Sequence, residues 1–264
     1  MFATDGRMLT RVETMHLGHF THLPRRLGYA ITQQNGVTLI NCGLNSSMFN
    51  IVFGGLEQPS EGDMTNVMQT FNGQPFAWWI PPSQKRDTLE HLLQTHGLTQ
   101  EAREEAMVCD LTTCAIPAPR TALRVHKVET RAQLQDFTAL LSVYDAAASR
   151  FYEPALSVLQ KSDEHLFVGC AAGQPVVIGS LYCENHTAGL FGLITDAALR
   201  GRGYGTDMMS ALLRFANKNG ARYVTLSSSS DGGYRIYERL GFETLGAFAC
   251  FEYTGHPSSC DAPL

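Results

Sequence analysis

Apolar residues in the second half of the chain change their spacing from every second position to every third or fourth, and back again. Residues 123–128 alternate as in a strand, whereas Met208, Leu212 and Phe215 recur at positions i, i+4 and i+7 of one helix face. Gly220 follows them as a helix stop. The whole pattern predicts strands at 123–128, 166–172, 176–184, 189–195 and 223–226, and helices after Thr130, at 154–161, at 203–219 and at 233–240.

The first half of the chain contains the same types of element. Between the halves, residues 114–120 are rich in proline and form an extended joint. Interleaved strands and helices in both halves indicate the α/β (α+β) class. The pattern predicts strands at 37–42, 49–53, 76–80 and 106–111, and helices at 60–71 and 83–96. We divide the chain into an N-terminal domain at 1–116, a linker at 117–120, a second domain at 121–254 and a tail at 255–264.

A glycine-rich loop at 200–206 joins the strand at 189–195 to the long helix. Its alternating glycines permit positive φ angles and remove Cβ atoms from one side, so successive N–H groups can converge on an anion. The helix start adds unpaired N–H groups and the positive end of its dipole, while Arg200 and Arg202 add full charges. The loop therefore predicts a site for a diphosphate.

Two common phosphate-binding motifs fit this loop poorly. A Walker motif needs a lysine after its last glycine, and this chain has none there. A dinucleotide fingerprint needs a further glycine where Thr206 stands and an acidic residue about twenty positions later, where Leu226 stands. The sequence therefore excludes a Walker motif and makes a dinucleotide-binding fingerprint a weaker interpretation.

Two spaced motifs resemble one known family. Arg200, Gly203 and Gly205 match the signature Arg/Gln-x-x-Gly-x-Gly/Ala, and residues 237–242 (Tyr-Glu-Arg-Leu-Gly-Phe) resemble a tyrosine-bearing helix followed by a Leu-Gly-Phe turn. Both motifs are similar to those of the GNAT superfamily of N-acyltransferases. The resemblance implies the GNAT fold, a mixed and mostly antiparallel sheet flanked by helices, with acetyl-CoA as co-substrate and no metal.

The resemblance also implies roles for individual residues. The CoA pyrophosphate would dock on the loop amides, and its pantetheine arm would pair along a strand that splays from its neighbour at a bulge. An amine would attack the thioester directly, and Tyr237 would protonate the leaving thiolate, because a tyrosine with a pKa of about 10 is protonated at neutral pH. The implied cofactor-binding residues are Leu193, Ile194, Thr195, Arg200, Gly201, Arg202, Gly203, Tyr204, Gly205, Thr206 and Ser230.

The general base that takes the amine proton is less well defined by the sequence. Our candidate is Glu184, which ends the predicted strand at 176–184. His186 follows it closely, and Glu153 precedes the predicted helix at 154–161. A water relay is an equal alternative to any of these side chains.

Neither the histidines nor the cysteines predict a metal centre. His16, His19 and His22 recur every three residues, but Pro24 follows at once and no acidic or cysteine partner stands at a regular spacing. The seven cysteines are scattered without a Cys-x-x-Cys pair, which indicates reduced thiols in a reducing compartment.

The first half lacks the glycine-rich loop and so cannot form the same site. Residues 75–80, the following helix, Gly97 and a last strand resemble the degenerate first half of two-domain GNAT proteins; an unrelated α+β extension is the alternative. Many single-domain relatives pair across a two-fold axis, and two such halves in one chain would imitate that pairing. We therefore expect a monomer, with a homodimer as the alternative.

Composition narrows the class of partner. The 264 residues suffice for two cores, and the content of 44% hydrophobic and 17% charged residues is ordinary for a globular protein. The net charge of −5 gives no reason to expect nucleic acid, and no apolar stretch reaches the roughly 20 residues of a membrane span. We expect a cytoplasmic N-acetyltransferase that acts on a primary amine of a small molecule or peptide, with a non-catalytic acyl-CoA sensor or an interaction protein as alternatives.

Overall fold

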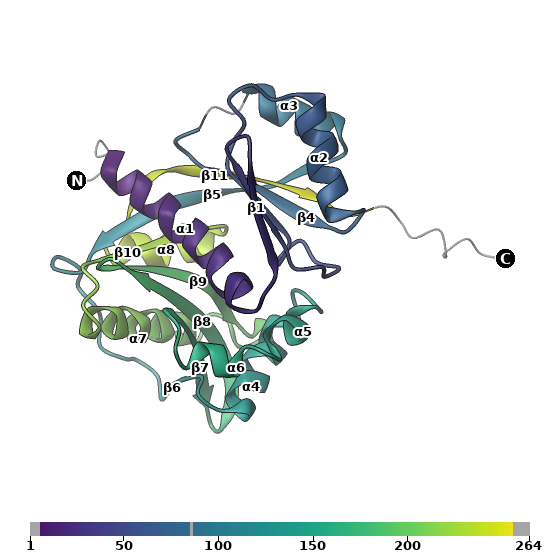
Figure 1. Cartoon of the computed structure of the whole chain (residues 1–264). Coiled ribbons are helices and arrows are strands. Elements are labelled where there is room, and N and C mark those ends of the chain that lie inside the picture. Colours follow the sequence, from purple (N-terminus) through teal and green to yellow (C-terminus); the bar gives the residue numbers. More distant parts are fainter. Residues whose placement is uncertain (1–5, 85–86, 256–264) are drawn as a thin grey trace.

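The computed structural model describes residues 6–84 and 87–255, which form one continuous eleven-stranded sheet with helices on both faces (Figure 1). The strand order is β1-β2-β3-β4-β11-β5-β10-β9-β8-β7-β6. The strands are β1 (Ala30–Gln34), β2 (Val37–Asn41), β3 (Ile51–Phe53), β4 (Phe76–Ile80), β5 (Thr99–Asp110), β6 (Arg124–Lys127), β7 (Glu164–Ala171), β8 (Gln174–Glu184), β9 (Thr187–Thr195), β10 (Tyr223–Ser228) and β11 (Glu243–Tyr253). The helices are α1 (Gly6–Arg26), α2 (Glu61–Phe71), α3 (Asp87–Thr95), α4 (Arg131–Leu141), α5 (Ala148–Tyr152), α6 (Leu156–Leu159), the 3₁₀ turn η1 (Ala197–Leu199), α7 (Tyr204–Lys218) and α8 (Asp231–Arg239).

The order of elements in the first half recurs in the second. In each half three antiparallel strands, β1 to β3 or β7 to β9, lead through a helix to a parallel strand. A helical crossover is needed there because consecutive parallel strands start at the same edge of the sheet. A further helix and a last strand follow in both halves. From β1 and from β7 towards the centre of the sheet, the strands therefore follow one another in the same arrangement. β6 is an added strand at one edge.

The two halves exchange their last strands. β5, from the first half, lies between β11 and β10, and it pairs antiparallel with β10 over six residue pairs. β11, from the second half, lies between β4 and β5, and it pairs antiparallel with β4 over five residue pairs. Each half therefore completes its sheet with a strand that the other half supplies.

The cores follow this exchange. On one face α1 crosses from half to half (Figure 1), and the core beneath it joins Val12 of α1 to Phe137 of α4. Side chains of a strand alternate between faces, so other residues of β5 and β11 enter the two cores on the opposite face. Met107 of β5 packs with α7 and α8, and Phe251 of β11 packs with α2 and α3. Both outer cores thus contain residues from both halves.

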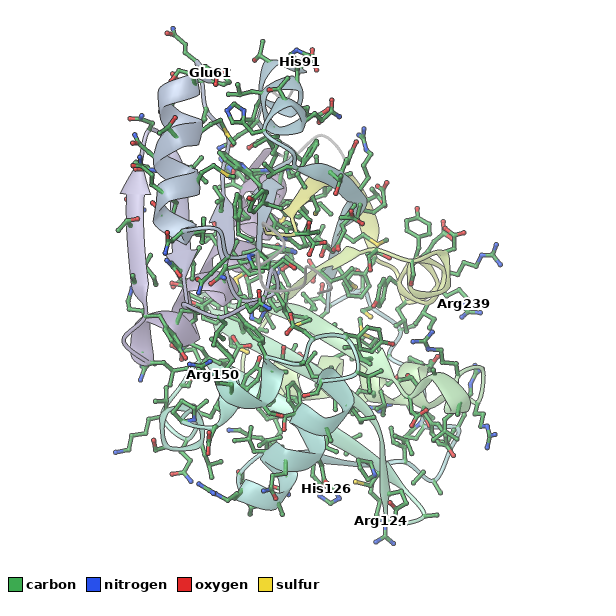
Figure 2. The ribbon with its side chains drawn as sticks, turned by 90° about the vertical axis from the view of Figure 1, so that its right-hand side faces the viewer. Glu61, His91, Arg124, His126, Arg150 and Arg239 are labelled. Carbon is green, nitrogen blue, oxygen red and sulfur yellow. The ribbon has the colours of Figure 1, made fainter. Side chains whose placement is uncertain are left out.

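The side chains labelled in Figure 2 mark the two ends of the molecule and the region between them. Glu61 in α2 and His91 in α3 mark the outer end of the first half. Arg124 and His126 mark β6, the edge strand at the opposite end. Arg150 in α5 lies between these two ends.

The predicted fold class is confirmed, and most predicted elements are present. Helix α4 starts with a capping box between Thr130 and Gln133. The hairpin β7–β8 turns at Ala172 and Gly173, whose φ angles are +50° and +80°, as a tight two-residue hairpin requires. The sheet is mixed and mostly antiparallel, as the resemblance implied.

Five elements were not predicted, namely α1, β1, α5, η1 and β11, and β5 was predicted too short. The helix α1 was missed, and Pro24 is accommodated inside it close to its end. Strands β1 and β11 were also missed. Strand β5 starts at Thr99, whereas its start was predicted at 106. The earlier residues of this strand were missed because they are polar and do not alternate with apolar residues.

The predicted division near residues 116–121 falls between β5 and β6. Because the sheet is continuous, this division describes a repeat along the chain, and the boundary itself stays a prediction. Residues 256–264 of the predicted tail, with Cys260, lie outside the described residues. In the part of the chain that the structure describes, no helix is both long and apolar enough to cross a membrane.

Candidate active site

Strands β9 and β10 are paired only where they begin. Their register covers residues 187–189 of β9, after which the strands separate although β9 continues to Thr195. On the other side of β9 the register with β8 shifts between Ile178 and Ser180, and Gly192 has a φ of +57°. Such a φ suits a bulge that bends the strand. The bulge and the separation implied by the family resemblance are therefore present.

The first turn of α7 presents free backbone donors. Gly203 is the N-cap, with a φ of +89° and no side chain to cap the helix. Among the described residues, the N–H groups of residues 202–206 donate no hydrogen bond. Unpaired N–H groups and the helix dipole together favour an anion at this position. The geometry suits the predicted diphosphate site, which comprises Gly201, Tyr204, Gly205 and Thr206 besides the two arginines.

The two arginines of the loop are exposed. Arg200 donates from Nε to the carbonyl of Thr195 at 3.3 Å and from Nη2 to the hydroxyl of Tyr144. The Thr195 carbonyl is therefore already in use. Arg202 adds its charge beside the helix start, where a phosphate would be attracted.

The connector between the halves supports the loop from behind. Asp207 is only 4% exposed, and its carboxylate accepts from the backbone N–H groups of Arg120 and Thr121 at 2.7–3.1 Å. The Thr121 hydroxyl also donates to it, at 2.6 Å. A Cβ atom at Gly203 would lie 3.3 Å from Cγ2 of Thr121. Gly203 is thus required both by its φ angle and by this close approach.

A cavity of about 650 Å³ opens where β9 leaves β10. Residues of both halves form its wall, from α1, β4 and β5 on one side to β9 and α8 on the other. Of the site residues predicted from the sequence, it brings together Leu193, Ile194, Ser230 and Tyr237.

Tyr237 is held in the wall of this cavity. Its side chain is 8% exposed and packs against Phe242, with ring centroids 5.9 Å apart. Burial, together with the nearby Glu104 carboxylate, raises the pKa of Tyr237 to about 12, so the phenol stays protonated at neutral pH. Ser230 caps α8 by accepting from the N–H of Gly233 at 3.2 Å, and this fixes the start of the helix that carries Tyr237.

Glu104 is a cavity residue that sequence reasoning missed. It comes from β5 of the first half, and the exchange of strands brings it beside β10. The hydroxyl of Ser227 donates to its Oε2. Burial raises the pKa of Glu104 in spite of this hydrogen bond. The one feature of the sequence that could have indicated Glu104 is the polar start of β5. A strand that is packed on both faces is normally apolar along its length.

The structure does not bring Glu184 into this cavity. Glu184 pairs with Thr187 at the end of β9 where β9 and β10 are still joined. Its Oε2 accepts from the Tyr182 hydroxyl at 3.2 Å, and it lines a separate pocket against α1. Because the hairpin register places it at the wrong end of β9, the prediction of Glu184 as the base is wrong for this cavity. His186 lies in the same turn, where its Nδ1 donates to the carbonyl of Gly220 at 3.1 Å.

The three histidines of α1 have three separate partners. Their contacts are His16 Nδ1 to the Val12 carbonyl at 2.9 Å, His19 Nδ1 to Glu164 Oε1 at 3.0 Å, and His22 Nε2 to the Ser162 hydroxyl at 2.8 Å. Burial lowers the pKa of His16 to about 3. Within residues 6–84 and 87–255, no group of three or more His, Cys, Asp or Glu side chains is placed to hold a metal ion.

The sequence of the second half matches a known family. Residues 125–242 match the model of the acetyltransferase (GNAT) family. An uncharacterized N-acetyltransferase of Methanocaldococcus jannaschii is 33% identical over 95 residues, which cover 32% of this chain and 42% of the relative. The match therefore spans less than half of the length of that relative.

Solved structures extend the likeness in fold to most of the chain. A GCN5-related N-acetyltransferase from Kribbella flavida superposes with a TM-score of 0.62 at 14% identity, covering 93% of this chain and 95% of that one. A tandem GNAT protein from the clavulanic acid biosynthesis pathway superposes with a TM-score of 0.55 at 12% identity, covering 97% of this chain and 98% of that one.

Motifs, family model and fold agree. The glycine-rich loop and the tyrosine helix both lie within the matched residues 125–242, and the tandem structure covers both halves. Residues 125–242 thus form a domain that matches the acetyltransferase (GNAT) family.

Proposed function

We propose that the protein transfers the acetyl group of acetyl-CoA to a primary amine of a small molecule or peptide. One arrangement carries this proposal: the separation of β9 from β10 opens a cavity lined by the buried phenol of Tyr237, and β9 leads from this cavity to the loop at the open start of α7. The loop could hold a diphosphate, the separated strand an extended arm, and the phenol a thiolate. Acetyl-CoA contains these groups in that order.

The donor would bind along the chain's own backbone. The pyrophosphate would rest on the N–H groups of residues 202–206, with the charges of Arg200 and Arg202 beside it. The pantetheine arm would then add to the edge of β9 that has left β10. A backbone N–H near Leu193 or Ile194 would polarise the thioester carbonyl, a type of contact worth about 2.7–4 kcal/mol of barrier.

The transfer would need one proton acceptor and one proton donor. The neutral amine attacks the thioester carbonyl carbon, forming the C–N bond, and its extra proton passes to the carboxylate of Glu104. The C–S bond then breaks, and the leaving thiolate takes the proton of Tyr237. The products are an amide and free CoA thiol. The proton on Glu104 can restore the phenol, since the two groups already interact electrostatically.

The first half thus has a role without binding a cofactor of its own. It supplies Glu104 through β5, and α1 forms one wall of the cavity. In this proposal the internal exchange of strands replaces the pairing of two subunits. The monomeric state and the cytoplasmic location stay predictions.

Two measurements on the purified chain test the proposal. Calorimetry with acetyl-CoA should show binding at one site, and an amine panel should release free thiol from acetyl-CoA. Binding without thiol release from any amine or peptide would favour a non-catalytic acyl-CoA sensor. Failure to bind acetyl-CoA would overturn the donor assignment.

A further inference from the structure

The acceptor cavity and the donor loop have opposite charge. The loop carries Arg200 and Arg202, whereas no lysine or arginine lines the cavity in the described part of the chain. The acidic residues of the lining are Glu101, Glu104, Asp145 and Glu252. A cavity with this charge favours a cation.

The acidic residues fall into two groups along the sheet. Glu104 stands beside Tyr237, where the reaction would take place. Glu252 lies further along the neighbouring strand: Glu104 pairs with Phe248, and Glu252 pairs with Thr99. Phe248 and Glu252 are four positions apart along the strand, which corresponds to about 13 Å. The cavity therefore has one carboxylate at the reacting end and another far from it.

Serine side chains hold the distant carboxylates in place. Ser47 donates to Oε1 of Glu252, and Ser46 donates to Oδ2 of Asp145. The N–H of Ala147 donates to the other oxygen of Asp145 at 2.8 Å. Both serines come from the loop between β2 and β3, so the first half positions the acidic groups at this end.

Aromatic rings line the stretch between the two ends. Phe20 of α1 packs against Trp79 of β4 at 5.2 Å between ring centroids. His19 stacks on Phe191 of β9 at 3.8 Å with an angle of 4° between the planes. Such a wall suits an apolar or aromatic segment, and its ring faces also attract cations.

A buried acceptor atom in the same wall supports a ligand that donates hydrogen bonds. His16 is completely buried and lines the cavity. Its Nδ1 donates to the Val12 carbonyl, so its Nε2 is an acceptor, and among the described residues that atom has no hydrogen-bond partner. A buried polar atom of this kind is costly unless a ligand satisfies it.

We propose that the acceptor is a diamine that is dicationic in solution: an apolar segment joins the nitrogen that reacts as the free amine, near Glu104 and Tyr237, to a second group that stays positively charged near Glu252 and Asp145. This inference rests on the proposed acetyl transfer and specifies its substrate class. The second charge would bind and orient the acceptor without touching the reacting atoms. Glu252 and Asp145 are thus specificity-determining residues.

The test compares linear alkane diamines of increasing length with alkyl monoamines of the same length, using thiol release from acetyl-CoA. We expect kcat/KM to rise sharply at the diamine length that reaches Glu252 and to exceed that of the matched monoamine about tenfold or more. Glu252→Gln should abolish this preference by raising the KM for the diamine to that of the matched monoamine. Asp145→Asn is the second variant, and Glu129→Gln, exposed and outside the cavity, is the matched control for net charge.

The possible outcomes separate this inference from the proposed function. Thiol release with equal preference for monoamines and diamines, unaffected by Glu252→Gln or Asp145→Asn, would overturn the dicationic acceptor and leave acetyl transfer intact. No thiol release from any amine would overturn the proposed function instead. Unchanged acetyl-CoA binding by calorimetry shows that each variant has folded.

Discussion

Two corresponding turns of the repeat, β3–α2 in the first half and β9–α7 in the second, have opposite helix starts. Helix α2 begins at Ser60, which forms a capping box with Asp63, and Glu61 adds a further negative charge. Helix α7 begins at Gly203, which offers no side chain to cap it. A closed, acidic helix start repels an anion, whereas an open start attracts one. At corresponding places in the two halves, the N–H groups of the helix start are therefore capped in α2 and free to bind an anion in α7.

The strands beside these helices differ in the same way. Strands β3 and β4 stay together to their ends: the Gly54 N–H donates to the Trp79 carbonyl at 3.0 Å, and the Trp78 indole N–H donates to the Gly54 carbonyl at 2.8 Å. Strands β9 and β10 part after Gly189. Among the described strands, the parallel pair that opens is the one in the second half, and an extended arm could add there.

The helix that bears Tyr237 completes the comparison. It ends with a hydrogen bond from the Phe242 N–H to the Tyr237 carbonyl at 3.0 Å, and α3 ends with the same bond from Leu98 to Leu93, also at 3.0 Å. Leu93 therefore stands where the second half has its phenol, and it is completely buried. The first half thus repeats the framework of the second without a counterpart of Tyr237, and in the proposed function it contributes to the acceptor cavity.

The largest effect should come from closing the open helix start. Gly203→Val forces a branched residue into a φ of +89° and towards Thr121, so we expect acetyl-CoA affinity to fall at least a hundredfold. Gly220→Val is the matched control, because it meets a φ of +85° with no atom within 4 Å at the other end of α7. Calorimetry should show near-normal acetyl-CoA affinity for the control, and equal losses in both variants would refute the loop as the binding site.

Removing the phenol that distinguishes the two halves should have the next largest effect. Tyr237→Phe should lower kcat roughly a hundredfold by loss of the proton donor, with acetyl-CoA affinity nearly unchanged. Tyr234→Phe, on the same helix, removes only a hydroxyl that accepts from Thr244 and should keep its rate. Steady-state thiol release measures both variants. A Tyr237→Phe enzyme with normal turnover contradicts the role of the phenol as acid.

Glu104, which the first half provides, should determine how kcat/KM depends on pH. A base works only when deprotonated, and burial raises the pKa of Glu104, so kcat/KM should rise with pH through a midpoint above the ordinary pKa of a glutamate. Glu104→Gln should remove this rise and lower the rate roughly tenfold to a hundredfold. Because the raised pKa means that the folded state disfavours the charged form, this variant should be no less stable at neutral pH.

The neighbouring residue provides the control for this prediction. Glu105→Gln removes a carboxylate from the opposite face of β5, outside the cavity lining, and should retain the pH profile. A Glu104→Gln variant with the same pH profile as the unchanged protein would show that another group or water accepts the proton.

The sequence was sufficient for features that depend on nearby residues. The open start of α7 follows from Gly203 within the loop, and the hairpin β7–β8 follows from two alternating strands around a glycine. Exchange of β5 and β11 could not be predicted, since it depends on pairing between residues more than a hundred positions apart. No local propensity encodes that choice.

The same limit explains the errors at the candidate site. Glu104 enters the cavity only because β5 pairs with β10, and nothing in residues 99–105 themselves indicates that partner. Glu184 was correctly placed at the end of a strand, but the direction in which β9 and β10 separate decides which end faces the cavity. A strand can be predicted locally, whereas its neighbours and the end at which they part cannot.

The smallest predicted effect tests whether the sealed helix start of the first half is structural alone. Ser60→Ala removes the capping box of α2 and should lower the free energy of unfolding by about 1 kcal/mol. Thr130→Ala, which removes the matching box of α4, should cost a similar amount. Denaturant unfolding measures both. Acetyl-CoA should still bind at one site in the Ser60→Ala variant, because β3 and β4 stay paired and Leu93 still replaces the phenol. A second binding site in that variant would mean that the cap alone separates the two halves in function.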